Sequence, residues 1–138
     1  TCAIPLMFPP IVIDGVPYLD GGCADKIPYA WALAAGFEKI IVVRTRPADY
    51  RKTGKPKRVK YPAYPLLAAQ LAGSDARYNR QCQELEALEQ AGRLVVINPS
   101  VDLQVARLEG DMEKLGRLYW MGNRDANAQL ERLRAYLV

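Results

Sequence analysis

Short apolar runs separated by turn residues predict a β-hairpin near the start of the chain. Residues 11–13 and 17–19 are apolar and flank the tripeptide Asp14-Gly15-Val16. Asp-Gly favours the tight turn that joins two antiparallel strands, so we place the turn at Asp14-Gly15. The preceding residues 3–10 are apolar but interrupted by prolines, and the Pro9-Pro10 pair excludes a regular helix there.

Residues 28–44 have the pattern of a helix followed by an apolar strand. Proline is favoured at the start of a helix and glycine just after its end, so Pro28 and Gly36 bound a helix over residues 29–35. Residues 39–44 are rich in Ile and Val without polar alternation, which is typical of a strand buried on both faces. This order of elements indicates the α/β class.

The same order recurs later in the chain. We predict a short helix over residues 64–71 and a longer one that begins at Ser74 or Asp75 and runs to about Ala91. Glycine follows it, and a second apolar strand covers residues 93–98 until Pro99 stops it.

Helical spacing predicts which faces of the later helices are apolar. On the longer helix we expect the core side to carry Leu85 and Leu88 and the water side to carry Glu84, Glu86 and Glu89. A further helix over residues 111–119 has three apolar residues on one face: Met112, Leu115 and Tyr119. A last helix opens at Asn123 or Asp125 and aligns three core leucines: Leu130, Leu133 and Leu137.

Composition excludes several kinds of chemistry. The chain contains no histidine, which excludes Ser-His-Asp and Cys-His catalysis and histidine-based metal sites. Cys2, Cys23 and Cys82 form no Cys-x-x-Cys pair, so we expect reduced thiols in a cytoplasmic compartment. A reactive Cys23 is conceivable, but a small buried apolar filler is the simpler interpretation. No apolar run is long enough to span a bilayer.

Basic residues are concentrated in residues 44–60, called the basic loop below. This window contains eight Lys or Arg residues and one acid, Asp49, so it carries +7 while the remainder of the chain carries −3. Such a loop could meet phosphates, lipid headgroups or RNA. The alternative is a solvated loop whose charge maintains solubility, since Pro47, Gly54 and Pro56 mark it as irregular.

The segment Asp20-Gly21-Gly22 is the strongest candidate for chemistry. Two consecutive glycines cost backbone entropy, which a sequence accepts where the backbone must pass close to another group. Asp20 is therefore a candidate catalytic carboxylate, and Leu19 with residues 5–8 could surround it with an apolar pocket. The alternative is a polar hairpin end, because Asp-Gly is a common turn dipeptide.

Other catalytic signatures do not occur in the sequence. Neither Gly-x-Gly-x-x-Gly nor Gly-x-x-x-x-Gly-Lys-Ser/Thr is present, so no nucleotide-binding loop of these kinds is indicated. Ser74 and Ser100 are the only serines, and neither lies in a Gly-x-Ser-x-Gly elbow. Thr1 with Cys2 would suit an N-terminal nucleophile, but a cleavage scar explains these residues more simply.

A series of spaced motifs resembles the C-terminal half of the bacterial patatin-like phospholipases. In order they are Ala3-Ile4-Pro5, Phe8-Pro9-Pro10, Asp14-Gly15, Tyr18-Leu19-Asp20-Gly21-Gly22, Ile27-Pro28, Ala30, Gly36, Lys39-Ile40-Ile41-Val42-Val43, Thr45-Arg46-Pro47 and Tyr50-Arg51-Lys52. The resemblance is densest over residues 1–52 and continues in pattern through the helical tail. It implies that residues 1–138 are the C-terminal portion of a single, layered α/β/α domain whose sheet is incomplete in this chain.

Patatin-like enzymes hydrolyse acyl esters of lipids with a Ser-Asp dyad, as phospholipases or esterases. The resemblance implies that Asp20 is the dyad aspartate and general base, with Gly21 and Gly22 as its motif glycines. The serine and the glycine-rich oxyanion loop would lie upstream of Thr1. We therefore expect a hydrolase without metal or cofactor, and a chain that is inactive alone and self-associates through open strand edges.

The expected partner is a lipid or another acyl ester, whose headgroup and chain length the sequence does not specify. The alternative is a non-catalytic anion-binding module whose basic loop engages a membrane surface; nucleic acid is the weaker partner, because no RNA-binding motif is present. Contact with a membrane would use six basic residues: Arg51, Lys52, Lys55, Lys57, Arg58 and Lys60. Both interpretations place the protein in the cytoplasm, free or peripheral to the membrane.

Overall fold

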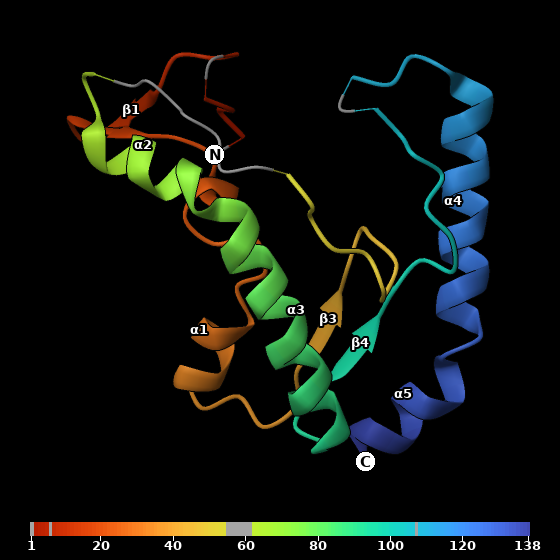
Figure 1. Ribbon diagram of the computed structural model, residues 1–138. Helices are drawn as coiled ribbons and strands as arrows, with labels where there is room; N and C mark the ends of the chain where they lie inside the picture. The colour runs from red at the N-terminus through yellow and green to blue at the C-terminus, as the bar shows by residue number, and fades with distance from the viewer. Residues whose placement is uncertain (1, 6, 55–61, 107) are drawn as a thin grey trace. The chain divides into compact units, whose positions relative to one another are not determined.

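The computed structural model describes residues 2–5, 7–54, 62–106 and 108–138 and has a mixed α/β fold (Figure 1). In chain order its elements are β1 (Ile11–Ile13), β2 (Val16–Tyr18), η1 (Gly21–Cys23), α1 (Tyr29–Ala34), β3 (Ile41–Val43), α2 (Pro65–Ala72), α3 (Ser74–Gln90), β4 (Val95–Ile97), α4 (Met112–Asn127) and α5 (Leu130–Leu137), where η1 is a 3-10 turn.

The chain divides into two compact units. Unit 1 comprises Thr1–Pro28 and Arg51–Gln81, and unit 2 comprises Tyr29–Tyr50 and Cys82–Val138. That both are portions of one patatin-like domain stays a prediction. Among the residues described, no helix is long and apolar enough to cross a membrane.

Unit 1 contains the predicted hairpin. β1 and β2 are antiparallel with Ile13 opposite Val16, which leaves Asp14 and Gly15 as the two turn residues. Both have positive φ, 50° and 77°, as a type I′ turn requires. The hairpin prediction is confirmed, and the described part of residues 3–10 contains no helix, as the prolines predict. Later in unit 1, α2 begins at Pro65 and closes at Gly73, in agreement with the predicted short helix.

Unit 2 contains a parallel pair of strands. β3 lies beside β4 with Val42 opposite Val96, and Val95 N–H donates to Ile40 O at 3.0 Å (Figure 1). Val42 is 9% exposed and Val96 5% exposed, so these central residues belong to the core. Both predicted strands are confirmed. Helix α1 also forms as predicted, with Gly36 after it at φ 82°.

The unit 2 part of α3 supplies the centre of this core. Cys82 and Leu85 are almost fully buried, as expected for the apolar side of the helix. The prediction that Glu89 simply faces water is wrong: Glu89 Oε1 accepts a hydrogen bond of 2.8 Å from Val96 N–H and pairs with Arg132 at 2.5 Å. The physical reason is that Val96 N–H points away from β3, and a buried strand N–H needs an acceptor.

The boundary between the last two helices differs from the prediction. No helix opens at Asn123 or Asp125, because α4 runs through both and ends only at Asn127. Asp125 instead accepts a hydrogen bond of 2.7 Å from Ser100 N–H, in the loop after β4. Its carboxylate therefore fixes that loop rather than capping a new helix.

The apolar faces of α4 and α5 were also partly mispredicted. Met112 is 77% and Tyr119 66% exposed, while Met121, on another side of α4, is buried. On α5, Leu130 and Leu137 are exposed, and the helix is instead held through Tyr136. The Tyr136 hydroxyl accepts from Ile40 N–H at 2.9 Å and donates to Arg93 O at 3.1 Å. A polar anchor therefore replaces much of the expected leucine core.

Candidate functional site

Asp20 lies at the junction between the hairpin and η1 in unit 1. Its N–H donates to Ala3 O at 3.0 Å, which ties the junction to the segment before the hairpin. Its side chain caps η1, with Oδ1 accepting a hydrogen bond of 2.7 Å from Gly22 N–H. No other residue of the described chain bonds this carboxylate. One oxygen is therefore held in place, and no donor among the described residues reaches the other.

The two motif glycines have different roles. Neither has a positive φ, so the turn does not require glycine for its backbone conformation. A Cβ at Gly22 would lie 3.0 Å from Asp20 Oδ1, closer than side chains ordinarily pack. A Cβ at Gly21 would meet nothing within 4 Å. Within the described residues the close approach at Gly22 is to the Asp20 carboxylate, and the approach of a catalytic partner stays a prediction.

Asp20 lines a cavity of about 220 Å³ within unit 1. The other lining residues are Leu19, Gly21, Cys23, Ala24, Leu67 and Gln70. Leu19 was expected there, but Met7 and Phe8 are exposed and do not line it, and Leu6 lies outside the described residues. Helix α2 supplies the apolar wall instead, through Leu67. A cavity this open and largely apolar suits one end of an apolar ligand better than a hydrated ion.

The cysteines occupy three different environments. Cys82 is the buried filler of unit 2, Cys2 is exposed, and Cys23 is half-buried beside Asp20 in the cavity wall. The carbonyl of Cys23 accepts a hydrogen bond from Arg77 at 3.5 Å. Within the described ranges no group of His, Cys, Asp and Glu side chains is arranged to hold a metal ion.

The described part of the basic loop is bound into the fold. Arg44 is buried and donates to Asn98 Oδ1 and Cys82 Sγ. Lys52 lies in unit 1 and pairs with Asp75 at 3.1 Å. Arg51 and Lys52 are the described members of the predicted membrane contact, and the other four lie outside the described residues: Lys55, Lys57, Arg58 and Lys60. That contact stays a prediction.

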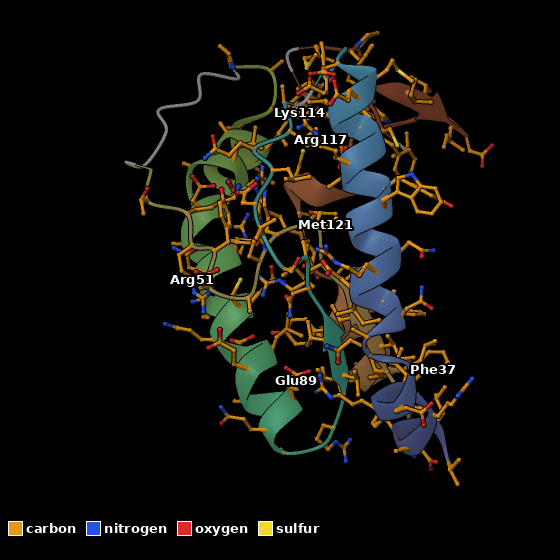
Figure 2. The ribbon with its side chains drawn as sticks, turned by 90° about the vertical axis from the view of Figure 1, so that its right-hand side faces the viewer. Phe37, Arg51, Glu89, Lys114, Arg117 and Met121 are labelled. Carbon is orange, nitrogen blue, oxygen red and sulfur yellow. The ribbon has the colours of Figure 1, made fainter. Side chains whose placement is uncertain are left out.

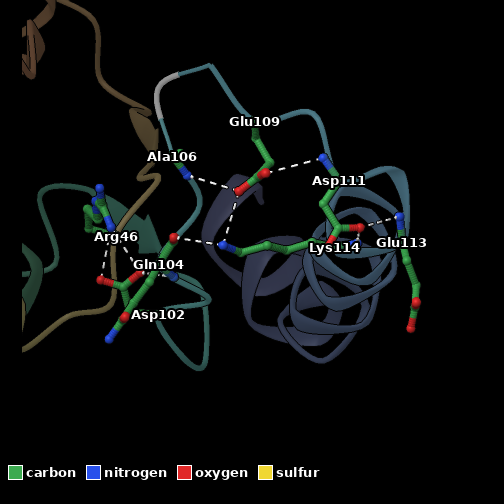
Figure 3. A network of polar contacts seen from close by, with 8 residues as sticks. All are labelled: Arg46, Asp102, Gln104, Ala106, Glu109, Asp111, Glu113 and Lys114. Carbon is green, nitrogen blue, oxygen red and sulfur yellow. Dashed lines mark hydrogen bonds and ion pairs between the residues drawn. The ribbon is translucent and has the colours of Figure 1, made fainter.

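Unit 2 contains a polar network that the sequence analysis missed (Figure 3). It organises the loop between β4 and α4. Arg46 Nη1 lies 2.9 Å from Asp102 Oδ1, Gln104 N–H donates to the same carboxylate, and Lys114 Nζ donates to Gln104 O. Arg46 and Asp102 are 56 residues apart in the sequence, so spacing along the chain does not predict that they pair.

Glu109 is the most strongly perturbed acid of this network. Lys114 donates a hydrogen bond to its carboxylate, and the backbone N–H groups of Asp111 and Ala106 add two more. These contacts lower the pKa of Glu109 from 4.5 to about 2. Asp111 in turn caps α4 by accepting from Glu113 N–H at 3.0 Å. The network therefore fixes the loop to the first turn of α4.

The same loop borders a second cavity, of about 230 Å³, at the carboxyl ends of β3 and β4. Its walls are Thr45, Arg46, Pro99, Val101, Asp102, Leu103, Val105 and Leu118. Ligands of parallel sheets commonly bind at this end of the strands. The guanidinium of Arg46 is already occupied by Asp102 and stacks on Tyr50, so this cavity offers mainly apolar surface.

Comparison with known families identifies the second half of the chain. Residues 64–138 match the family described as a domain of unknown function, DUF6363. The chain belongs to the DUF6363 family. The matched residues, called the DUF6363 segment below, contain α2 to α5 and the Glu109 network, whereas Asp20 precedes them. No curated protein matches the chain. The family description assigns no activity, so function has to be inferred from the residues.

Proposed function

We propose that this chain supplies the aspartate of a Ser-Asp dyad in a patatin-like lipid acyl hydrolase, with Asp20 as the general base. The observation that carries the proposal is the setting of its carboxylate. Oδ1 is held at 2.7 Å by Gly22 N–H, and the side chain lines a largely apolar cavity. The bond from Gly22 N–H is a local turn contact that Asp commonly makes, so the position of the side chain in the cavity wall is what supports an acid available for chemistry.

The chemistry requires an oriented carboxylate beside an alcohol. A serine hydroxyl attacks an ester only when a base within hydrogen-bond reach takes its proton. Fixing one oxygen of Asp20 through Gly22 directs the other as the acceptor. Leu19 and Leu67 in the cavity wall suit the apolar part of an acyl ester. General-base assistance of this kind contributes roughly 100-fold to 10,000-fold in rate.

The nucleophile is proposed to come from outside these 138 residues. Ser74 is buried to 9% exposure at the start of α3, and Ser100 lies in unit 2 with its N–H bound to Asp125. Neither lies in the glycine-flanked elbow that exposes a nucleophilic serine. A serine-bearing polypeptide therefore has to meet the Asp20 cavity.

The sheet of unit 2 supports the same proposal. The edge of β4 that faces away from β3 is covered where Glu89 accepts from Val96 N–H. On β3, Ile41 is 39% and Val43 72% exposed, and within the described chain β4 is the one strand that pairs with it. Exposure of apolar side chains on a parallel strand is unusual, since parallel sheets are normally covered on both faces. Further strands of an α/β/α sheet would add on the β3 side.

The test measures hydrolysis of p-nitrophenyl butyrate. The protein assayed is the full-length gene product, in which a Gly-x-Ser-x-Gly segment is proposed to precede this chain. Asp20→Asn should lower kcat/KM at least about 100-fold without changing the circular dichroism spectrum. Asp14→Asn is the matched control, because asparagine tolerates the positive φ of this exposed turn residue. The 138-residue chain alone should show no turnover. Full activity of Asp20→Asn, or Asp20-independent turnover by the chain alone, would exclude the proposal.

A further inference from the structure

We propose that the outer face of α4 docks on an anionic phospholipid surface. This face carries large side chains that the fold leaves uncovered: Met112 is 77%, Tyr119 66% and Trp120 68% exposed. The rings of Tyr119 and Trp120 meet edge to face with centroids 5.3 Å apart, so they form one aromatic cluster. An exposed cluster of this size is costly in water unless something covers it.

Cationic side chains lie on the side of α4 that carries Trp120. Arg117 precedes Trp120 by three residues and Arg124 follows it by four, spacings that align side chains along one side of a helix. The Arg117 side chain is 63% and the Arg124 side chain 72% exposed, and the same side also carries the exposed carboxylate of Glu113. Arg117, Trp120 and Arg124, together with Tyr119 through its ring contact with Trp120, are called the α4 face. Figure 2 shows α4 with Lys114, Arg117 and Met121 labelled.

The ion pairs that these arginines make within the protein are weak. Arg117 approaches Glu113 only to 4.0 Å, and both side chains are exposed. Such exposed pairs contribute little to stability, so the Arg117 guanidinium can turn toward a phosphate group at small cost. Arg124 approaches Asp125, which is 12% exposed, to 3.7 Å and donates to Ser100 Oγ at 3.4 Å, so it is more restrained than Arg117.

The combination of residue types favours a lipid surface over other partners. Trp and Tyr prefer the boundary between headgroups and acyl chains, where an apolar ring and a polar N–H or O–H are both satisfied. Flanking arginines add attraction to anionic headgroups. The inward side of α4, by contrast, is held by Met121 in the core and by Lys114 on Glu109. The helix would lie in the interface without crossing it.

This inference gives the DUF6363 segment a role of its own. α4 lies within residues 64–138, and the α4 face contains neither Asp20 nor any residue of its cavity. Vesicle binding is measured without turnover, so failure of the hydrolase proposal would leave this test intact, and the reverse also holds.

The experiment is co-sedimentation of the full chain with vesicles of 70% phosphatidylcholine and 30% phosphatidylglycerol, compared with pure phosphatidylcholine. We expect binding to the anionic vesicles that falls as salt rises. Trp120→Ala should weaken it about tenfold or more. Arg117→Gln with Arg124→Gln should weaken it about 25-fold, from about fivefold for each arginine. In a Trp31→Phe background, Trp120 fluorescence should shift to shorter wavelength on binding.

Trp31 provides the matched control, because it is equally exposed at 68% but has no arginine on its helix. Trp31→Ala should bind like the parent chain. The proposal is overturned by equal binding to neutral vesicles, by binding that depends on Trp31 rather than Trp120, or by no vesicle binding at all. It is also overturned if the arginine substitutions reduce binding to RNA but not to vesicles. A third contrary result is that Trp120→Ala leaves vesicle binding unchanged and only converts a dimer to a monomer. Circular dichroism checks that each variant is folded. If Trp120→Ala does not fold, vesicle binding by the double variant Arg117→Gln with Arg124→Gln still tests the proposal.

Discussion

Lys114 and Glu109 form an ion pair of 3.0 Å that joins the first turn of α4 to the loop before it. The same ammonium group donates to Gln104 O, so one side chain crosses the loop at two points (Figure 3). Both side chains are largely shielded, at 27% and 15% exposure. This pair positions the start of the helix whose outer face we propose to bind lipid.

The first prediction concerns the acidity of Glu109. Its carboxylate should titrate with a pKa of about 2, well below the ordinary 4.5, because Lys114 and two backbone N–H groups favour the charged form. Lys114→Met should move the midpoint upward toward 4.5 in an NMR titration of the side-chain carboxyl carbon. Arg117→Met, which removes a cation that pairs with Glu113, should leave it in place.

The pH dependence of stability follows from that shift. The pKa of Glu109 is depressed in the folded protein, so its contribution to stability is present above pH 4.5 and is lost as the pH falls through about 2. The parent chain should therefore lose more stability between pH 4.5 and pH 2 than Lys114→Met does. Equal losses in the two proteins would contradict the assigned contact.

The second prediction separates the two motif glycines. Gly22→Ala should displace the Asp20 carboxylate, because the new Cβ would lie 3.0 Å from Oδ1. The resulting weakening of that hydrogen bond should reduce the free energy of unfolding by up to about 1 kcal/mol in urea titrations. Gly21→Ala meets open space and should be neutral or stabilise by up to about 1 kcal/mol. A larger loss at Gly21 than at Gly22 would refute this account of the turn.

The third prediction concerns the anchor on α5. Tyr136→Phe removes the hydroxyl that accepts from Ile40 N–H and donates to Arg93 O. Ile40 is buried, so the unpaired N–H should lower the free energy of unfolding by about 1–3 kcal/mol. Tyr119→Phe removes an exposed hydroxyl and should change it by less than about 0.5 kcal/mol. Faster amide exchange at Ile40 in Tyr136→Phe would locate the effect.

The fourth prediction tests the core of unit 2. Leu85 is 1% exposed, so Leu85→Ala should cost about 2–5 kcal/mol through lost burial and a cavity. Leu66→Ala, at a side chain that is 83% exposed on α2, should change stability by less than about 0.5 kcal/mol. Comparable losses at the two positions, measured by thermal unfolding, would show that the assignment of Leu85 to the core is wrong.

Local rules predicted the elements whose causes are local. Asp14 and Gly15 adopt the positive φ angles that a two-residue hairpin turn requires, and Pro28 and Gly36 bound α1 as expected. The strands 41–43 and 95–97 lie within runs of Ile and Val. In each case the residue type restricts its own backbone conformation, so no distant partner is needed.

The errors arose where a distant partner takes over a local signal. Asp125 has the chemistry of a helix cap but binds Ser100 N–H, and α4 therefore continues past it. Glu89 has the spacing of a solvent-facing acid, but it accepts a hydrogen bond from Val96 N–H and forms an ion pair with Arg132. A carboxylate accepts hydrogen bonds from whichever donors the fold places beside it. The spacing of residues along one helix does not specify which donors these are.

The sequence alone determined the mixed α/β class, the hairpin and the two apolar strands, because these depend on backbone restriction and apolar runs. The tertiary structure alone decided that Leu67 lines the cavity beside Asp20 and that Trp120 and Tyr119 remain outside the core. Those outcomes depend on which surfaces meet when helices pack, and burial is a property of the assembled chain rather than of any segment.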